Sequence, residues 1–364
     1  MSAQSYIKGI LSGYKHYKDY WNYEDGCILM GCKQLYEATG ERAYLDFILD
    51  YTDPLIAADG TITNFEFGKH SIDSFNAGKI LFLAYDKTGD ERYRKAIDFL
   101  MRELRDQPRT AEGNFIHKAI YPGQVWLDGL YMAQPFYMEY ETRYGGKEHY
   151  NDILSQFRNV RKYMYDSVKG LYYHGYDTLK EQPWCDKQTG LSPNFWLRSV
   201  GWYLMALIDV IDNMSEEIYE QYREYCDLFR EAVTGILRYR AEDGLFCQVI
   251  DHMDTVGNYT ETSGSAMIAY AIMKAARLKV LSREKYEPIG IDIFDSIVKN
   301  KLKDVPDGSQ TLTDICWVAG LGPGDKRDGS VAYYLSEKIV SDDAKGVGPF
   351  MMAYAQKLLL EKTR

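Results

Sequence analysis

Two patterns of apolar residues alternate along the chain. Between residues 91 and 106 the apolar residues recur every three or four positions, as Tyr93, Ile97 and Leu100 do, which predicts a helix with one face in solvent. Between residues 200 and 211 almost every residue is apolar, which predicts a helix that is buried nearly all round. Each helix of the buried type is followed by a short turn, an amphipathic helix and a longer loop.

This unit of two helices and a loop recurs along the whole chain. The six buried-type helices are expected to begin near residues 23, 72, 127, 198, 262 and 346. Turns between paired helices carry a glycine, such as Gly40 and Gly89, which suits a helix end with positive φ. Buried helices that alternate with amphipathic ones predict an all-α fold, an (α/α)6 barrel of six helical hairpins in two concentric rings. We expect residues 1–364 to form a single domain of this kind.

The loops that lead from an outer helix back to an inner one contain Gly, Asp and aromatic residues, as at 60–67, 170–174 and 244–250. Their β-favouring residues predict short β-hairpins. Because all of these loops join the same ends of the two rings, we expect them to gather on one face and to hold the binding pocket there. The loop at 305–345 is expected to be the least regular.

Composition and charge narrow the classes of partner. The net charge is −10 and no long basic run occurs, which argues against nucleic acid and against an anionic membrane surface. No apolar run reaches the length of a membrane span. The six cysteines form no C-x-x-C pair, so we expect reduced thiols in a cytoplasmic protein. Metal-ligand spacings and glycine-rich phosphate loops are missing, so we expect neither a metal nor an organic cofactor.

Two aspartates begin buried-type helices in consecutive repeats. Asp73 and Asp128 can each cap a helix by accepting hydrogen bonds from backbone N–H groups, or act as acids in catalysis. Trp126 lies two residues before Asp128, and the loop before it contains His117 and Lys118. Ionisable groups and tryptophans at corresponding positions of neighbouring repeats favour a functional site over simple capping.

Another group of candidates lies around the next buried helix. Arg198 and Trp202 are four residues apart and therefore share one helix face. Arg198 opens an otherwise apolar helix, where a charge requires a partner; the partner can be a protein carboxylate or the carboxylate of a ligand. His174 lies among aromatic residues, where a structural role is the more common one. Aromatic residues form 14% of the chain, which suits helix packing as well as stacking against sugar rings.

Several segments together resemble glycoside hydrolase family 105, the unsaturated rhamnogalacturonyl hydrolases, over nearly the whole chain. The segments are residues 21–26, 121–122, 126–132, 190–193, 195–198, 201–203, 263–267, 328–330 and 333–336. The most specific are Trp-Leu-Asp-Gly-Leu-Tyr-Met at 126–132 and Phe-Trp-Leu-Arg at 195–198. That family is known for an (α/α)6 barrel, in agreement with the repeats.

The resemblance implies a role for each candidate. Asp128 matches the general acid/base of the family and Asp73 its second active-site carboxylate. The positions that match substrate contacts are Trp126, His174, Arg198, Trp202, Lys118 and Tyr23. Among these, Arg198 and Lys118 are expected to bind the carboxylate of a uronic acid, with no metal and no cofactor involved.

The implied substrate is a small anionic oligosaccharide left by a pectin lyase, with a 4,5-unsaturated galacturonic acid at its nonreducing end. Three alternatives stay open from the sequence. The related family 88 acts on unsaturated glucuronyl ends of glycosaminoglycans, and a sugar epimerase or a hydrolase of saturated glycosides can use the same barrel. The third alternative is a sugar-binding protein without activity, which the presence of Asp128 disfavours.

Overall fold

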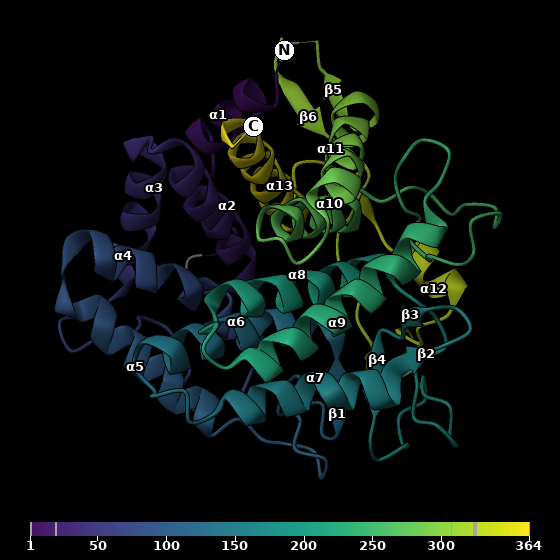
Figure 1. Ribbon diagram of the computed structural model, residues 1–364, viewed down its shortest axis with the longest axis horizontal. Coiled ribbons are helices and arrows are strands. Elements are labelled where there is room, and N and C mark those ends of the chain that lie inside the picture. Colours follow the sequence, from purple (N-terminus) through teal and green to yellow (C-terminus); the bar gives the residue numbers. More distant parts are fainter. Residues whose placement is uncertain (1, 19, 307, 323–325, 364) are drawn as a thin grey trace.

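Two layers of helices form a double ring in the computed structural model, which describes residues 2–18, 20–306, 308–322 and 326–363 (Figure 1). The inner ring consists of α2 (Tyr23–Thr39), α4 (Ile80–Thr88), α6 (Leu127–Arg143), α8 (Leu197–Asn213), α10 (Thr262–Arg277) and α13 (Ala344–Lys362). Neighbouring inner segments contact one another, and α13 contacts α2, so the ring closes. The outer layer contains α3 (Arg42–Thr52), α5 (Glu91–Arg105), α7 (Tyr150–Met164), α9 (Tyr219–Ile236) and α11 (Arg283–Asn300). The predicted (α/α)6 barrel is confirmed.

The sixth pair of helices is built from the two ends of the chain. Within the described residues no outer helix follows α13, and its outer partner is α1 (Ala3–Ser12). The Tyr6 ring meets the Phe350 ring of α13 edge to face, with centroids 5.7 Å apart. The Tyr6 hydroxyl also donates a 2.6 Å hydrogen bond to Asp342, just before α13. Five hairpins are therefore continuous in sequence, and the last one joins the N-terminal and C-terminal helices.

The sequence pattern explains which face each helix buries. The periodic apolar residues of α5, including Tyr93, Ile97 and Leu104, are all buried, whereas α8 is buried from Leu197 to Ile211. Gly40 and Gly89 follow α2 and α4 with φ values of 74° and 66°. These two left-handed ends turn each inner helix toward its outer partner, as the sequence predicts.

The second inner segment is broken at its start. Two short 3-10 turns, η2 (Ile72–Phe75) and η3 (Ala77–Lys79), precede α4. The backbone N–H of Ile72 donates to the carbonyl of His117 at 3.1 Å, and the Asn76 amide donates to the carbonyl of Tyr23 at 2.9 Å. These contacts hold the irregular start, which contains Asp73, against the loop at His117 and against α2.

A proline in α6 explains a buried lysine in η3. Pro135 lies inside α6 and has no N–H to donate to the carbonyl of Tyr131, four residues earlier. Lys79 Nζ donates to that carbonyl at 2.7 Å, although Lys79 is only 2% exposed. The lysine therefore supplies the hydrogen bond that the proline removes.

Short strands organise the loops at one end of the barrel. β1 (Gln124–Trp126) pairs antiparallel with β4 (Gly175–Asp177), and this places Trp126 opposite Gly175. A small hairpin, β2 (Tyr165–Asp166) with β3 (Leu171–Tyr172), follows α7. Of the three predicted β-hairpins, the one at 170–174 is confirmed, whereas the described loops at 60–67 and 244–250 have isolated bridges instead, Ile56 with Ile62 and Arg240 with Phe246. β1 and β4 belong to different loops. The pairing of β1 with β4 joins the loop before α6 to the loop before α8.

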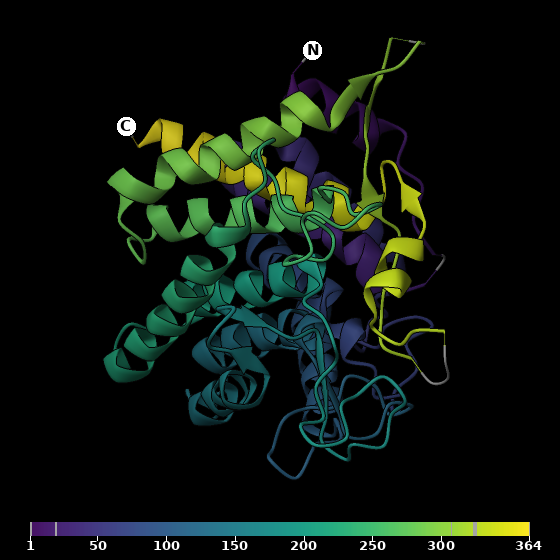
Figure 2. The ribbon, with the colours of Figure 1, turned by 90° about the vertical axis from the view of Figure 1, so that its right-hand side faces the viewer.

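The loop at 305–345 is irregular, as expected, although its residues 307 and 323–325 lie outside the described part of the chain. Its described part contains β6 (Gln310–Leu312), which pairs with β5 (Leu302–Asp304), and β7 (Ile315–Cys316), which pairs with β8 (Ile339–Val340). Between β7 and β8 lies α12 (Val331–Ser336). Figure 2 shows this yellow-green segment along one side of the molecule. Among the described helices, none has the length and apolarity needed to cross a membrane.

Candidate active site

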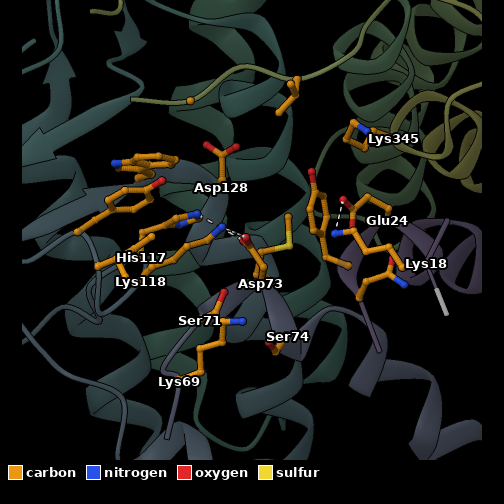
Figure 3. Close-up of a pocket in the computed structure, with 18 of the residues that line it drawn as sticks. Lys18, Glu24, Lys69, Ser71, Asp73, Ser74, His117, Lys118, Asp128 and Lys345 are labelled. Atoms are coloured by element: carbon orange, nitrogen blue, oxygen red, sulfur yellow. Dashed lines mark hydrogen bonds and ion pairs between the residues drawn. The ribbon is translucent and has the colours of Figure 1, made fainter. Parts of the chain in front are cut away.

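A cavity of about 860 Å³ lies at the N-terminal ends of the inner helices, under the long loops. The sequence-predicted residues that line it are Tyr23, Asp73, Lys118, Trp126, Asp128, Arg198 and Trp202. Figure 3 shows Asp73 and Asp128 in the middle of the cavity, with His117 and Lys118 on one side and Lys18, Glu24 and Lys345 on the other. The loop face therefore holds a pocket, and residues from distant repeats meet in it.

Asp73 is held by two basic side chains. Lys118 Nζ lies 2.7 Å from Asp73 Oδ2, and His117 Nε2 lies 3.4 Å from Oδ1. Burial raises the pKa of Asp73, but the charge of Lys118 and its hydrogen bond outweigh this effect, so the pKa is lowered overall. Asp73 is therefore an anion at neutral pH. No described backbone N–H donates to its side chain, so it is no helix cap.

Asp128 has far fewer contacts. Its nearest basic group is His174, whose Nε2 lies 3.3 Å from Asp128 Oδ2. The angles do not make a hydrogen bond, and Oδ2 is buried with no hydrogen-bond partner among the described atoms. The N-cap of α6 is Trp126 rather than Asp128. Asp128 therefore presents a carboxyl group that is close to the cavity and not bound in a strong ion pair.

His174 lies behind Asp128 rather than on the cavity wall. It is fully buried and does not line the cavity. Its Nδ1 is 2.7 Å from the hydroxyl of Tyr334, whose pKa is well above the usual value, chiefly because of burial. When the Tyr334 hydroxyl donates to Nδ1, the hydrogen on Nε2 faces Asp128. His174 was expected to contact the substrate; in the structure it lies beside Asp128 and outside the cavity lining.

A stack of aromatic rings forms the wall beside Asp128. The Trp126 ring lies parallel to His117, with centroids 4.3 Å apart, and to Tyr121, with centroids 5.2 Å apart. Burial lowers the pKa of His117 to about 4, even though Asp73 opposes the shift. His117 is therefore neutral at neutral pH, and its flat ring supports Trp126 from behind.

Arg198 is paired with a protein carboxylate. Its Nε donates to Ser263 Oγ at 2.7 Å, its Nη2 lies 3.4 Å from Glu261 Oε1, and Nη2 also donates to the carbonyl of Cys316. Glu261 is fully buried and accepts the backbone N–H of Cys316 at 3.0 Å. Of the two partners open from the sequence, the structure has the protein carboxylate.

Trp202 and Tyr23 complete the floor of the cavity. Trp202 is 2% exposed and stacks on Tyr131, with centroids 4.7 Å apart. Tyr23 lies at the first position of α2, and burial raises its pKa well above the usual value. The Tyr23 side chain is therefore a neutral hydrogen-bonding group.

Several lining residues are absent from the sequence predictions. They include Lys18, Glu24, Trp196, Arg327 and Lys345. Glu24 could have been found from the sequence, because it follows Tyr23 in the segment 21–26. Arg327 could not, because it lies in the irregular loop, where no sequence pattern predicts a site residue. The lining has more cationic than acidic side chains, although the whole chain has a net charge of −10. An anionic ligand is favoured by this local excess of positive charge and by the helix N-termini.

A helical double ring with two carboxylates and aromatic walls in a loop-side cavity is an arrangement typical of an enzyme that cleaves glycosidic bonds. The family model described as Glycosyl Hydrolase Family 88 matches residues 6–360, and the chain belongs to this family. The chain is therefore a glycosidase of the family 88 and family 105 type.

Three known proteins illustrate the similarity. A family 105 glycoside hydrolase from C. acetobutylicum ATCC 824 is 40% identical over 98% of both chains, with a TM-score of 0.93. Protein Atu3128 of Agrobacterium fabrum is 41% identical over 241 residues, which are 64% of this chain and 100% of that protein. The unsaturated rhamnogalacturonyl hydrolase YesR of Bacillus subtilis is 26% identical over 264 residues, which are 71% of this chain and 72% of that protein. The resemblance to family 105 is confirmed.

Proposed function

We propose that this glycosidase releases a 4,5-unsaturated galacturonic acid from the nonreducing end of pectin-derived rhamnogalacturonan oligosaccharides. The observation that carries the proposal is the contrast between the two carboxylates of the cavity. Asp73 is an anion held by Lys118 at 2.7 Å, whereas Asp128 has no lysine or arginine partner among the described residues and has His174 Nε2 at 3.3 Å. The name of the relative YesR, an unsaturated rhamnogalacturonyl hydrolase, supports the choice of substrate.

In the proposed reaction Asp128 acts first as an acid and then as a base. It donates a proton to C4 of the C4=C5 bond, and the cation that forms at C5 is stabilised by the ring oxygen. The ionised Asp128 then takes a proton from a water molecule as the water oxygen bonds to C5. The hemiketal opens by breaking the bond from C5 to the ring oxygen, and C1, now a hemiacetal, releases the hydroxyl of the next sugar.

The other groups of the site support this sequence of steps. Asp73 carries a fixed negative charge, which stabilises the cation at C5. Trp126, which stacks on His117 and Tyr121, contributes apolar surface to the cavity that also contains Asp128, and a sugar ring can lie against it. His174, held by Tyr334, places its Nε2 3.3 Å from Asp128 Oδ2, close enough for a hydrogen bond once the carboxyl group turns toward it.

The test follows the ultraviolet absorbance of the conjugated C4=C5 bond. Purified protein is incubated in parallel with unsaturated galacturonyl-rhamnose, with an unsaturated chondroitin disaccharide and with a saturated galacturonyl-rhamnose. We expect the absorbance to fall with the first substrate and no cleavage of the third. A fall with the chondroitin disaccharide alone would move the substrate to glycosaminoglycans. Cleavage of the saturated analogue, or no reaction with either unsaturated disaccharide, would contradict the proposal.

A further inference from the structure

Almost all cationic side chains around the cavity are paired with a carboxylate of the protein. The pairs are Lys18 with Glu24 at 3.1 Å, Lys69 with Glu66 at 2.7 Å, Lys118 with Asp73 at 2.7 Å, Lys345 with Asp343 at 2.8 Å and Arg198 with Glu261 at 3.4 Å. A cation in such a pair has its charge already neutralised. An anionic substrate therefore competes with a protein carboxylate at each of these positions.

Arg327 is the exception among the lining cations. No carboxylate of the described residues lies within ion-pair distance of its guanidinium, although Arg327 lines the cavity and is only partly exposed. Its backbone carbonyl accepts the N–H of Gly322 at 3.3 Å, which ties the residue to the wall segment that contains Gly320. The backbone of Arg327 is thus fixed to the cavity wall, and its guanidinium has no carboxylate partner in the described part of the chain.

The tip of Arg327 lies next to Trp126. A methyl group placed on Gly320 would lie 3.3 Å from Arg327 Nη1 and 3.3 Å from Cζ3 of Trp126. The guanidinium and the outer edge of the tryptophan ring therefore both lie close to Gly320, where a side chain would be tightly packed against each of them. Trp126, Gly320 and Arg327 line the same cavity as Asp128.

We propose that Arg327 binds the carboxylate of the uronic acid while the sugar ring lies against Trp126. The inference deepens the proposed function and rests on it for the identity of the sugar. A guanidinium presents parallel N–H groups that match the two oxygens of a carboxylate. Because no carboxylate of the described residues pairs with Arg327, these donors are available, and its position near Trp126 places the bound carboxylate next to the stacked ring.

This assignment replaces the one made from the sequence, in which Arg198 and Lys118 bind the carboxylate. Lys118 is held by Asp73. The Arg198 donors reach Ser263, Glu261 and the carbonyl of Cys316. Arg198 is therefore a positioning residue that fixes the chain at Cys316, from which the wall segment leads to Gly320 and Arg327.

The test measures binding of a charged and an uncharged sugar, without turnover. Galacturonate and its methyl ester are titrated by calorimetry into the wild-type protein, into Arg327→Gln and into Lys326→Gln. Lys326 is the exposed neighbour and does not line the cavity, so its variant controls for loss of one charge. We expect the wild type and Lys326→Gln to prefer galacturonate by about tenfold or more. Arg327→Gln should bind both sugars alike.

Kinetics with the unsaturated disaccharide provide a second measurement. Because the carboxylate keeps its negative charge from the bound substrate to the transition state, Arg327→Gln should raise KM by about tenfold or more and leave kcat within a few-fold. Arg327→Lys keeps the charge without the planar fork and should recover part of the loss.

Two results would overturn the assignment: a preference for galacturonate that persists in Arg327→Gln, or no preference in the wild type. A preference that depends on Arg327, combined with no reaction of any unsaturated disaccharide, would refute the proposed reaction and leave the binding site standing.

Discussion

At the scale of single residues, two aspartates in equivalent places have opposite surroundings. Asp73 lies between Lys118 and His117, whereas His174 is the one described basic side chain within ion-pair distance of Asp128. We expect Asp128→Asn to lower kcat/KM by about 10²–10⁴-fold or more, the usual contribution of a positioned acid–base group. The fold should be unaffected, because the described structure shows no hydrogen bond to the Asp128 carboxyl group that is lost. Asp254→Asn, at an exposed position, is the control, and near-full activity of Asp128→Asn would contradict the role.

The buried His117 should make the stability of the protein depend on pH. Its pKa is lowered to about 4 in the folded protein by burial, against about 6.5 in an unfolded chain. The unfolded state therefore binds a proton first, and the stability that is fully present above pH 6.5 is lost as the pH falls toward 4. Between pH 6.5 and 5 the loss from this residue should be about 2 kcal/mol.

Urea unfolding at pH 7 and pH 5 measures this effect. His117→Phe keeps a flat ring beside Trp126 but cannot take up a proton, so its free energy of unfolding should fall less between the two pH values than that of the wild type. His252→Phe, a half-exposed histidine, controls for the loss of one histidine. If the free energy of unfolding falls equally in the wild type and in His117→Phe, His117 does not cause the pH dependence of stability.

At the scale of elements, the packing of η3 on α6 depends on the pairing of Lys79 with the carbonyl that Pro135 leaves free. Lys79→Met should destabilise the protein by about 1–3 kcal/mol, because the buried carbonyl of Tyr131 loses its only described donor from outside the helix. Pro135→Ala restores a backbone N–H in α6 that can bond to the same carbonyl. In that background Lys79→Met should cost clearly less.

The wild type, the two single variants and the double variant are compared by urea unfolding at pH 7. Burial lowers the pKa of Lys79 to about 7, so the experiment is repeated at pH 8, where the amine is mostly neutral and still donates. The same coupling is expected at both pH values. Strictly additive effects of Lys79→Met and Pro135→Ala would mean that the carbonyl does not connect the two residues.

At the scale of the whole molecule, the repeats were sufficient to predict the double ring and the end of it that holds the site. Asp73 and Asp128 could be placed there because each begins an inner segment, and every such start lies on the loop face. The partners of His174 and Arg198 could not be predicted from the sequence, because they are brought together by loops that lie far apart along the chain. His174 reaches Asp128 through the pairing of β1 with β4, and Glu261 meets Arg198 from a different hairpin.

The closing pair of helices was also hidden in the sequence, since α1 and α13 lie at opposite ends of the chain. The ring closes on the outside through Tyr6, which is 3% exposed and contacts Phe350 and Asp342. Tyr6→Ala should therefore lower the free energy of unfolding by about 3–5 kcal/mol, as expected for a buried aromatic residue. Tyr6→Phe keeps the ring and loses only the hydrogen bond, so it should cost about 1 kcal/mol. Because Tyr6 does not line the cavity, kcat/KM at 25 °C should stay unchanged in both variants. If Tyr6→Phe and Tyr6→Ala destabilise the protein equally, the hydrogen bond alone holds α1 against α13. A loss of activity in a folded Tyr6 variant would show that the packing of α1 on α13 also affects the active site.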